Sequence, residues 1–283
     1  MFLALYLLLL CDESQLAFGG PIKGGPVWMK IDTNISSTTV SINKQIVGGA
    51  QANQGDVPWH ALIVPDATNL CGASLISNQW IMTAGHCVYW HPQFSVYLGR
   101  TDRLNTQPGS VMLTVKTKVV NPKYTGTQDW ADLALLKFDA PLDITKYPYI
   151  KPIRLVKKSL STSAFVGTKV YVSGFGKTSD DPAPSNKLMW TNNTVVSSTV
   201  CKQTFGSLIR TEIICMSGTG PRSICHGDSG GAMVYQEADG IFTQIGTVAF
   251  VYSSCIQGKP QGFVRTGFYL SWISSTTGIP MRP

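Results

Sequence analysis

The sequence predicts an all-β fold, and three observations lead to this prediction. Its apolar runs are short, as expected for strands rather than long helices. The runs are separated by Gly, Pro, Asn and Asp residues, which are typical of turns. Only one stretch, residues 267–273 near the C-terminus, has the apolar spacing of a helix. The clearest strand runs are residues 59–64, 111–115, 169–172 and 243–248.

The N-terminal region differs in composition from the rest of the chain. Residues 1–10 are almost entirely apolar, but a helix that crosses a bilayer needs about 20 such residues. The run suits the apolar part of a signal peptide, although it lacks a preceding Lys or Arg. We expect residues 1–19 to be a signal peptide, 20–45 a propeptide rich in Gly, Ser and Thr, and 46–283 the folded part. The protein is therefore expected to be secreted and extracellular.

The cysteines favour disulfides over a metal site. Of the seven cysteines, Cys11 lies in or beside the expected signal peptide, which leaves an even number. An even number in a secreted chain indicates disulfides, although several pairings stay open. The chain has no CxxC pair, which disfavours structural zinc, and residues 100–112 show no calcium-binding carboxylate cluster. We expect no metal and no cofactor.

The formal net charge of +7 lies in residues 46–283, because lysines and acidic residues cancel within residues 1–45. The basic residues are spread along the chain, which is typical of a solvated surface. A weak preference for acidic substrates or polyanions is the alternative interpretation. Nothing in the sequence indicates specific nucleic-acid recognition.

The stretch 225–231, Cys-His-Gly-Asp-Ser-Gly-Gly, carries the strongest functional signal. A serine hydroxyl such as that of Ser229 is a poor nucleophile at neutral pH and needs a general base and an oxyanion site nearby. Flanking glycines let the backbone turn sharply and present N–H groups to a substrate carbonyl. Two upstream motifs offer partners: Thr-Ala-Gly-His-Cys at 83–87 and Asp-Leu-Ala-Leu-Leu at 132–136. The chain order His, Asp, Ser is that of one lineage of catalytic triads.

Together with Ile-Val-Gly-Gly at 46–49, these motifs resemble those of secreted serine endopeptidases of the chymotrypsin/trypsin family. The resemblance covers residue 46 to about residue 278. It implies two six-stranded antiparallel β-barrels joined near residues 145–165, with the active site between them and a C-terminal helix. Residues 46–283 would then be the catalytic domain, with one barrel as each subdomain. The stretches 83–87 and 250–255 look similar to arthropod digestive or venom proteases.

The resemblance assigns a role to each motif residue. Ser229 is expected to attack the scissile carbonyl, with His86 as general base and then general acid. Asp132 is expected to hold the imidazole in the right tautomer, and the backbone N–H groups of Gly227 and Ser229 to form the oxyanion hole. Asp129 is the nearest competitor of Asp132, but it lies outside the Asp-Leu-Ala-Leu-Leu pattern. No comparable motif contains His60, His91 or His226.

The family is activated by a cut before the residue that corresponds to Ile46, whose new α-amino group pairs with the buried carboxylate of Asp228. Losing one partner of a buried ion pair costs about 3–5 kcal/mol, so the uncut chain is expected to lack a formed oxyanion site. Here Gln45 precedes the cut, whereas trypsin-like activators cut after Arg or Lys. Either another protease cuts after Gln45, or trimming follows a first cut after Lys44. The alternative is a catalytically inactive homologue that acts as a binding or cofactor protein.

In this family the side chain before the cut enters a pocket whose base is formed here by Ser223. This residue is uncharged, so cleavage after Lys or Arg is disfavoured. Val251 and Ile224 add bulk, so we expect an apolar, partly narrowed pocket with chymotrypsin- or elastase-like specificity. The residues expected to line it are Ser223, Ile224, Ala249, Phe250, Val251 and Gly262.

Some smaller expectations complete the resemblance. Gly85 and Ala232 stand where the family usually has Ala and Pro, and both are expected to be tolerated. Asn192 begins a glycosylation sequon, and a second sequon at Asn34 lies in the propeptide. As partners we expect protein or peptide substrates and protease inhibitors, with no nucleic acid, no membrane and a monomeric state. The implied disulfides are Cys71–Cys87, Cys201–Cys215 and Cys225–Cys255.

Overall fold

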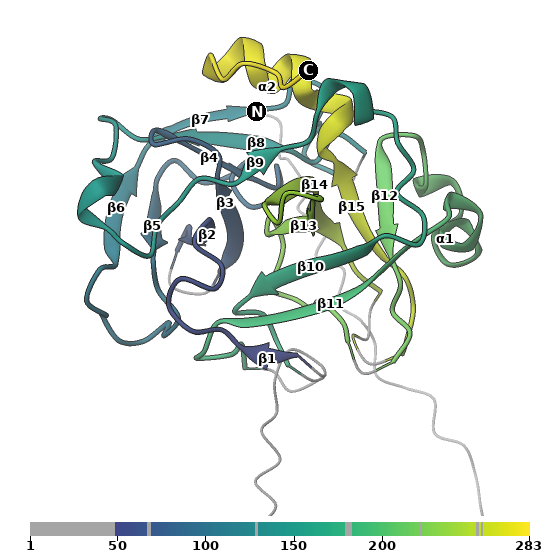
Figure 1. Ribbon diagram of the computed structural model, residues 1–283, viewed down its shortest axis with the longest axis horizontal. Coiled ribbons are helices and arrows are strands. Elements are labelled where there is room, and N and C mark those ends of the chain that lie inside the picture. Colours follow the sequence, from purple (N-terminus) through teal and green to yellow (C-terminus); the bar gives the residue numbers. More distant parts are fainter. Residues whose placement is uncertain are drawn as a thin grey trace, which may run out of the picture. The chain divides into compact units, whose positions relative to one another are not determined.

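The protein folds into two β-sheets, each of which curls toward a barrel (Figure 1). The structure is a computed structural model that describes residues 49–66, 69–127, 130–178, 183–220, 222–252, 255 and 257–283. These residues belong to one compact unit, Asn43–Pro283. The expected signal peptide, the expected propeptide, Ile46 and Asp129 lie outside the described residues.

The first sheet is entirely antiparallel, and a shared segment curls it. Strands β6 and β7 follow one another with only Lys116 between them. This single extended segment pairs with β5 at one end and with β8 at the other, which brings the two sides of the sheet together. In sheet order the strands are β6 (Val111–Val115), β5 (Phe94–Leu98), β2 (His60–Val64), β3 (Cys71–Leu75), β4 (Trp80–Thr83), β8 (Ala134–Lys137) and β7 (Thr117–Val120).

The second sheet contains a closed six-stranded barrel. Closure comes from β11 and β12, which pair with each other at the two ends of the strand order. A bulge interrupts the pairing of β14 with β15 between Val248 and Phe250. The short strand β1 (Ala50–Gln51) extends the sheet beside β11, and β9 (Arg154–Leu155) lies parallel to β14. The barrel strands are β11 (Met189–Val196), β10 (Lys169–Gly174), β13 (Ala232–Gln236), β14 (Phe242–Phe250), β15 (Gln261–Arg265) and β12 (Ile213–Met216). The expected all-β, two-barrel architecture is confirmed.

Strands β2, β3, β4 and β8 of the first barrel are buried on both faces. Successive side chains of a strand point to opposite faces, so consecutive apolar residues serve two different cores. The core inside the first barrel receives Ile63, Ile81 and Leu136. The core that continues into the second barrel receives their neighbours Leu62, Met82 and Leu135. This shared core fixes the seam between the barrels.

The expected C-terminal helix is present, although it starts and ends later than the sequence pattern predicted. The 3₁₀ turn η5 (Thr266–Tyr269) leads into α2 (Leu270–Thr277), which ends at Gly278 in the left-handed region with φ 76°. A second helix, α1 (Ser198–Phe205), lies beside β12 and begins at the capping residue Ser197 (Figure 1). Within the described residues, the further 3₁₀ turns are η2 (Ile144–Lys146), η3 (Lys158–Leu160) and η4 (Gly206–Leu208).

Three disulfides cross-link the fold, and they join the same pairs that the resemblance implied. The first ties β3 to the turn after β4, the second ties α1 to β12, and the third ties the segment before β13 to the segment before β15. Closing a loop of about 15 residues stabilises a fold by roughly 3 kcal/mol in the chain-entropy model. The pairs are Cys71–Cys87, Cys201–Cys215 and Cys225–Cys255.

Candidate active site

His86 and Asp132 come together because the strands beside them pair. Thr83 at the end of β4 lies opposite Ala134 at the start of β8, so the turn after β4 and the segment before β8 lie close together. Nδ1 of His86 lies 2.6 Å from Oδ2 of Asp132. The backbone N–H of His86 donates to Oδ1 of the same carboxylate at 2.7 Å. Both carboxylate oxygens therefore hold one residue, which fixes the orientation of its ring.

The environment sets the protonation of this pair. Asp132 is 1% exposed, whereas the imidazole of His86 is 31% exposed. Burial alone would lower the pKa of His86, but the hydrogen bond and the negative charge of Asp132 outweigh it and raise the pKa. Because a carboxylate only accepts, the proton of the neutral ring belongs on Nδ1 and the lone pair on Nε2. The pair can thus remove a proton from a hydroxyl at Nε2.

Lys118 on β7 holds the far end of the turn that carries His86. Its ammonium donates hydrogen bonds to the backbone carbonyls of Val88, Tyr89 and His91 at 2.8, 2.7 and 2.8 Å. The three N–H groups of the ammonium donate to three acceptors, so these carbonyls at the end of the turn are hydrogen-bonded within the protein. No sequence motif indicated this contact.

Gly85, directly before His86, packs against the site. A Cβ at this position would lie 2.9 Å from Cδ1 of Tyr124 and 3.0 Å from Oδ1 of Asp132. Tyr124 is itself buried, and its ring meets that of Tyr89 edge-on with centroids 5.4 Å apart. The glycine therefore leaves room for the tyrosine ring beside the Asp132 carboxylate.

Ser229 lies in the loop before β13 of the second barrel, and this loop is hydrogen-bonded to the first barrel. Its carbonyl accepts from the N–H of Gly72 on β3 at 2.7 Å. Gly72 follows Cys71, which is disulfide-bonded to Cys87, the neighbour of His86. One hydrogen bond and one disulfide therefore link the Ser229 loop to the segment that carries His86, across the seam between the barrels.

The backbone of the Ser229 loop is a tight turn. Gly230 has φ 82°, and a Cβ there would lie 2.2 Å from Oγ1 of Thr83, so only glycine fits. The N–H groups of Asp228, Gly230 and Gly231 all donate to backbone carbonyls. In the described part of the chain, the N–H groups of Gly227 and Ser229 have no acceptor.

Asp228 points away from solvent into the second barrel. It is completely buried, with Oδ1 accepting from the N–H of Gly176 at 2.8 Å and Oδ2 from the N–H of Cys225 at 2.9 Å. Burial raises its pKa to about 6, although the two hydrogen bonds oppose the shift. Ile46, its expected partner, lies outside the described residues.

The residues expected to line the pocket gather where β14 ends and β15 begins. Gly262 pairs with Phe250, and a Cβ on the glycine would lie 2.1 Å from the Phe250 ring. This ring also meets that of Phe205 edge-on, with centroids 5.0 Å apart, while Val251 is half-buried beside it. The phenyl ring therefore fills the room that Gly262 leaves. The buried members are Ser223, Ile224, Ala249 and Gly262.

Gln261, which no sequence motif indicated, contacts the base residue of the expected pocket. Its Nε2 donates to Oγ of Ser223, and its Oε1 accepts from the N–H of Ile224 at 3.2 Å. The side chain is only 2% exposed. A buried amide therefore lies against the base of a pocket that the sequence predicted to be apolar. The only sequence signal is a polar residue at the start of the apolar strand β15.

The other histidines have different partners. His60 is buried with Nδ1 3.0 Å from Oγ of Ser173, and burial lowers its pKa to about 4. His91 lies 3.7 Å from the carboxylate of Asp66. His226 is exposed. None of these contacts resembles the pairing of an imidazole ring with a fully buried carboxylate.

Asn192, the first residue of the sequon, lies half-buried on β11. Its Oδ1 accepts a hydrogen bond from Nη1 of Arg222 at 3.1 Å. Its Nδ2, the atom to which an N-linked glycan is attached, has no partner in the described part of the chain.

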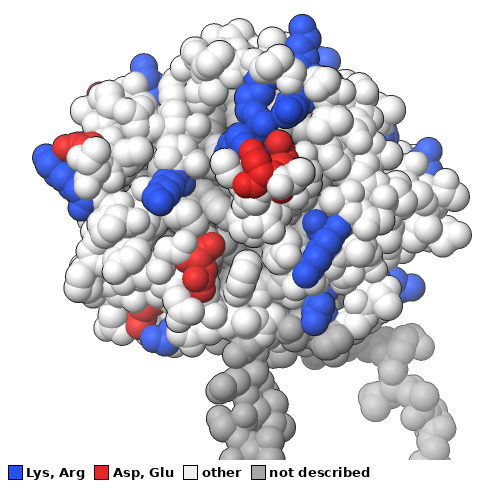
Figure 2. All heavy atoms as spheres, viewed as in Figure 1, with Lys and Arg blue, Asp and Glu red and all other residues white. Residues whose placement is uncertain are grey.

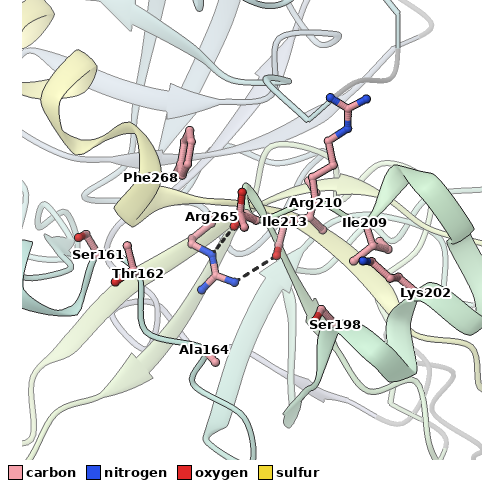
Figure 3. Close-up of a pocket in the computed structure, with 11 residues that line it drawn as sticks. Ser161, Thr162, Ala164, Ser198, Lys202, Ile209, Arg210, Ile213, Arg265 and Phe268 are labelled. Atoms are coloured by element: carbon pink, nitrogen blue, oxygen red, sulfur yellow. Dashed lines mark hydrogen bonds between the residues drawn. The ribbon is translucent and has the colours of Figure 1, made fainter.

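Basic residues do not form one continuous patch on the face shown in Figure 2, where they are scattered among uncharged residues. A cavity of about 390 Å³ has the basic side chains Lys202, Arg210 and Arg265 in its lining (Figure 3). Arg265 donates to the carbonyls of Thr211 and Ile213 at 2.9 and 3.2 Å, so its guanidinium links segments of the second barrel (Figure 3). No residue expected in the active site lines this cavity.

Comparisons with known proteins agree with this geometry. The family model described as Trypsin matches residues 46–273. Vitamin K-dependent protein C of Rattus norvegicus is 28% identical over 88% of this chain and 55% of its own length. Serine protease SP24D of Anopheles gambiae is 29% identical over 82% and 81%, and transmembrane protease serine 11E of Mus musculus is 26% identical over 87% and 58%. This chain thus spans little more than half of two of these relatives.

A solved structure also matches. It is described as HL collagenase, and it superposes with a TM-score of 0.73 at 31% identity, covering 83% of this chain and all of that one. The family model covers both barrels and all three motifs with His86, Asp132 and Ser229. The chain therefore belongs to the trypsin family, and its two-barrel domain is that of a serine endopeptidase.

Proposed function

We propose that the chain hydrolyses peptide bonds through an acyl-enzyme on Ser229, with His86 as general base and Asp132 as the orienting carboxylate. The observation that carries this proposal is the hold of Asp132 on both the ring and the backbone of His86. The hold places the ring proton on Nδ1 and leaves Nε2 to accept the serine proton. The raised pKa of His86 also favours the imidazolium that forms next.

Each step then has a donor and an acceptor. Oγ of Ser229 bonds to the scissile carbonyl carbon while its proton passes to Nε2 of His86. The carbonyl oxygen becomes an oxyanion, for which the N–H groups of Gly227 and Ser229 are the proposed donors; losing one such donor typically costs about 10²–10³ in rate. The C–N bond breaks as the imidazolium returns its proton to the amine. Water repeats the sequence to release the acid and restore Ser229.

We further propose a non-tryptic specificity. The base residue Ser223 and its neighbour Ile224 are uncharged and buried. A Lys or Arg side chain at this base would be buried without an anionic partner, which is costly. Val251 is half-buried and is proposed to narrow the pocket. Protein or peptide substrates with small or apolar residues before the cut fit this arrangement best.

We propose that the chain is a secreted zymogen, with a signal peptide at 1–19, a propeptide at 20–45 and activation by a cut before Ile46. The support is Asp228, whose buried carboxylate has no cationic partner in the described part of the chain. A new α-amino group that reached it would compensate its buried charge. Within the described residues, no helix is both long and apolar enough to traverse a bilayer.

Covalent labelling tests the proposed nucleophile. Protein processed to start at Ile46 is treated with a serine-directed phosphonate, and we expect one label, which Ser229→Ala abolishes while secretion is retained. Ser275→Ala, an exposed serine on α2, is the matched control and should label like the wild type. Label that persists on Ser229→Ala would remove Ser229 as the nucleophile. Absence of label and of peptide cleavage in the correctly processed wild type would instead favour the inactive homologue.

A further inference from the structure

The base of the expected pocket contains a closed set of hydrogen bonds. Oγ of Ser223 donates to the carbonyl of Ile224 at 2.9 Å, and the N–H of Ile224 donates to Oε1 of Gln261 at 3.2 Å. Nε2 of Gln261 then donates back to Oγ of Ser223. A backbone N–H can only donate, so it faces the oxygen of the amide and fixes which way the amide lies. These three residues are buried and uncharged.

We propose that Gln261 determines specificity, by raising the floor of this pocket so that only short, uncharged side chains such as those of Ala, Val and Thr fit before the cut. This inference rests on the proposed function of the chain as an endopeptidase that acts through Ser229. The floor of the pocket is then formed by the Gln261 side chain on β15 together with Ser223, and not by Ser223 alone.

The strand pairing explains how the amide reaches this place. On β15, Gln261 pairs with Met216 and Gly262 pairs with Cys215 of β12. On the other side of β15, Gly262 pairs with Phe250, whose ring covers it. Neighbouring side chains of a strand point to opposite faces. The residue next to Gly262 therefore points away from the Phe250 ring, and its amide meets Ser223.

The hydrogen bonds also explain which substrates are disfavoured. A long apolar side chain would have to displace the amide of Gln261 and leave the N–H of Ile224 and the hydroxyl of Ser223 unpaired in a buried place. A Lys or Arg side chain would find no negative charge on this floor. A short side chain requires neither displacement nor a counter-charge.

Replacement of the amide should deepen the pocket. Gln261→Gly removes the side chain, and we expect the ratio of kcat/KM for Phe over Ala before the cut to rise by about 10-fold or more. A matched control is Gln244→Gly, because Gln244 is also completely buried and also bonded to a serine, accepting from Oγ of Ser74 at 2.8 Å. The control should lose stability without a change in this ratio. An unchanged ratio in Gln261→Gly, or an equal change in both variants, would overturn the proposal.

A second variant conserves the size of the side chain. Gln261→Glu keeps an acceptor for the N–H of Ile224 but places a carboxylate on the floor. We expect it to gain cleavage after Arg and Lys at pH 8, with a preference for these residues over Ala at least about 10-fold above that of the wild type. No gain of basic specificity in a folded Gln261→Glu protein would show that the amide does not face the pocket.

Binding measurements separate this proposal from the proposed catalytic function. In the Ser229→Ala background, indole and benzamidine are titrated by calorimetry against each Gln261 variant. We expect indole to bind to Gln261→Gly, benzamidine to bind to Gln261→Glu, and neither to bind when Gln261 is present. This pattern, together with an absence of peptide cleavage by correctly processed protein that retains Ser229, would support the floor and reject the endopeptidase. Equal binding of a probe with and without Gln261 would reject the floor while leaving catalysis to its own test.

Discussion

The region around His86 and the region around Ser223 both lie where loops meet, but they are held in different ways. In the first region, residues of the motifs are hydrogen-bonded to one another, because the carboxylate of Asp132 accepts from both the ring and the backbone N–H of His86. In the second, the base residue is held by Gln261, a strand residue outside every motif. The comparison teaches that the groups proposed for the chemistry follow from short motifs, whereas the shape of the pocket follows from how strands pair.

The largest expected effect tests the first region. Asp132→Asn should lower kcat by about 10⁴, because an amide presents one acceptor where the carboxylate presents two and so favours the wrong tautomer of His86. Steady-state kinetics on a peptide substrate measures this. Asp139→Asn, an exposed carboxylate after β8, should leave kcat unchanged. A loss of less than 10-fold in Asp132→Asn would contradict the assigned role.

A smaller effect is expected at Gly85, in the same region. Gly85→Ala should destabilise the fold by about 1–3 kcal/mol, because the new methyl group overlaps the ring of Tyr124 and the carboxylate of Asp132. Chemical denaturation measures the free energy of unfolding. The double variant Gly85→Ala with Tyr124→Leu should cost less than the sum of the two single changes. Strict additivity would mean that the two side chains do not compete for space.

The seam also holds two buried groups with opposite effects of pH on stability. The pKa of His60 is lowered to about 4, so its contribution to the free energy of unfolding is lost as the pH falls below 6.5 toward 4. The pKa of Asp228 is raised to about 6, so its contribution is present below 3.8 and is lost as the pH rises through 6. The two contributions to the free energy of unfolding therefore change in opposite directions between about pH 4 and 6.

Replacing one of these groups should separate the two effects. The free energy of unfolding of His60→Gln minus that of the wild type should be about 2 kcal/mol more favourable to the variant at pH 5 than at pH 7. Denaturant titrations of both proteins at the two pH values give this number, and contributions from all other groups cancel in the comparison. The same difference at both pH values would show that burial does not shift the pKa of His60.

The smallest expected effect tests the second region. Val251→Gly should raise the ratio of activity on aromatic over small aliphatic residues before the cut, by about 10-fold or less, because it removes bulk from the side of the pocket. Cleavage of matched peptides gives this ratio. If Gln261→Gly changes the ratio and Val251→Gly does not, the depth of the pocket rather than its width limits which substrate side chains it accepts.

Much of the fold could be predicted from local patterns. The apolar run 111–115 coincides with β6, and the run 243–248 lies within β14. Helix α1 was missed because its only buried residue is Cys201, so no repeating apolar face marks it. Its boundary signal, the capping Ser197, is too common among turn residues to predict a helix alone.

The pocket could not be predicted to the same depth. The family resemblance implies that Gly262 lines the pocket, and the structure places the neighbouring Gln261 against the base residue Ser223. Which of two consecutive strand residues faces a site depends on register, and a one-residue shift exchanges the faces. Here the bulge between Val248 and Phe250 sets that register. Nothing in the composition of β14 marks the position of the bulge.

Lys118 offers a way to observe the turn that carries His86. Burial lowers the pKa of this amine, but its nitrogen becomes a nucleophile only after its hydrogen bonds to Val88, Tyr89 and His91 are broken. Amine-acylating reagents should therefore modify exposed lysines first and Lys118 only when the turn opens. The rate at which Lys118 becomes acylated would then report, by mass spectrometry and without any substrate, how often the site loses its shape.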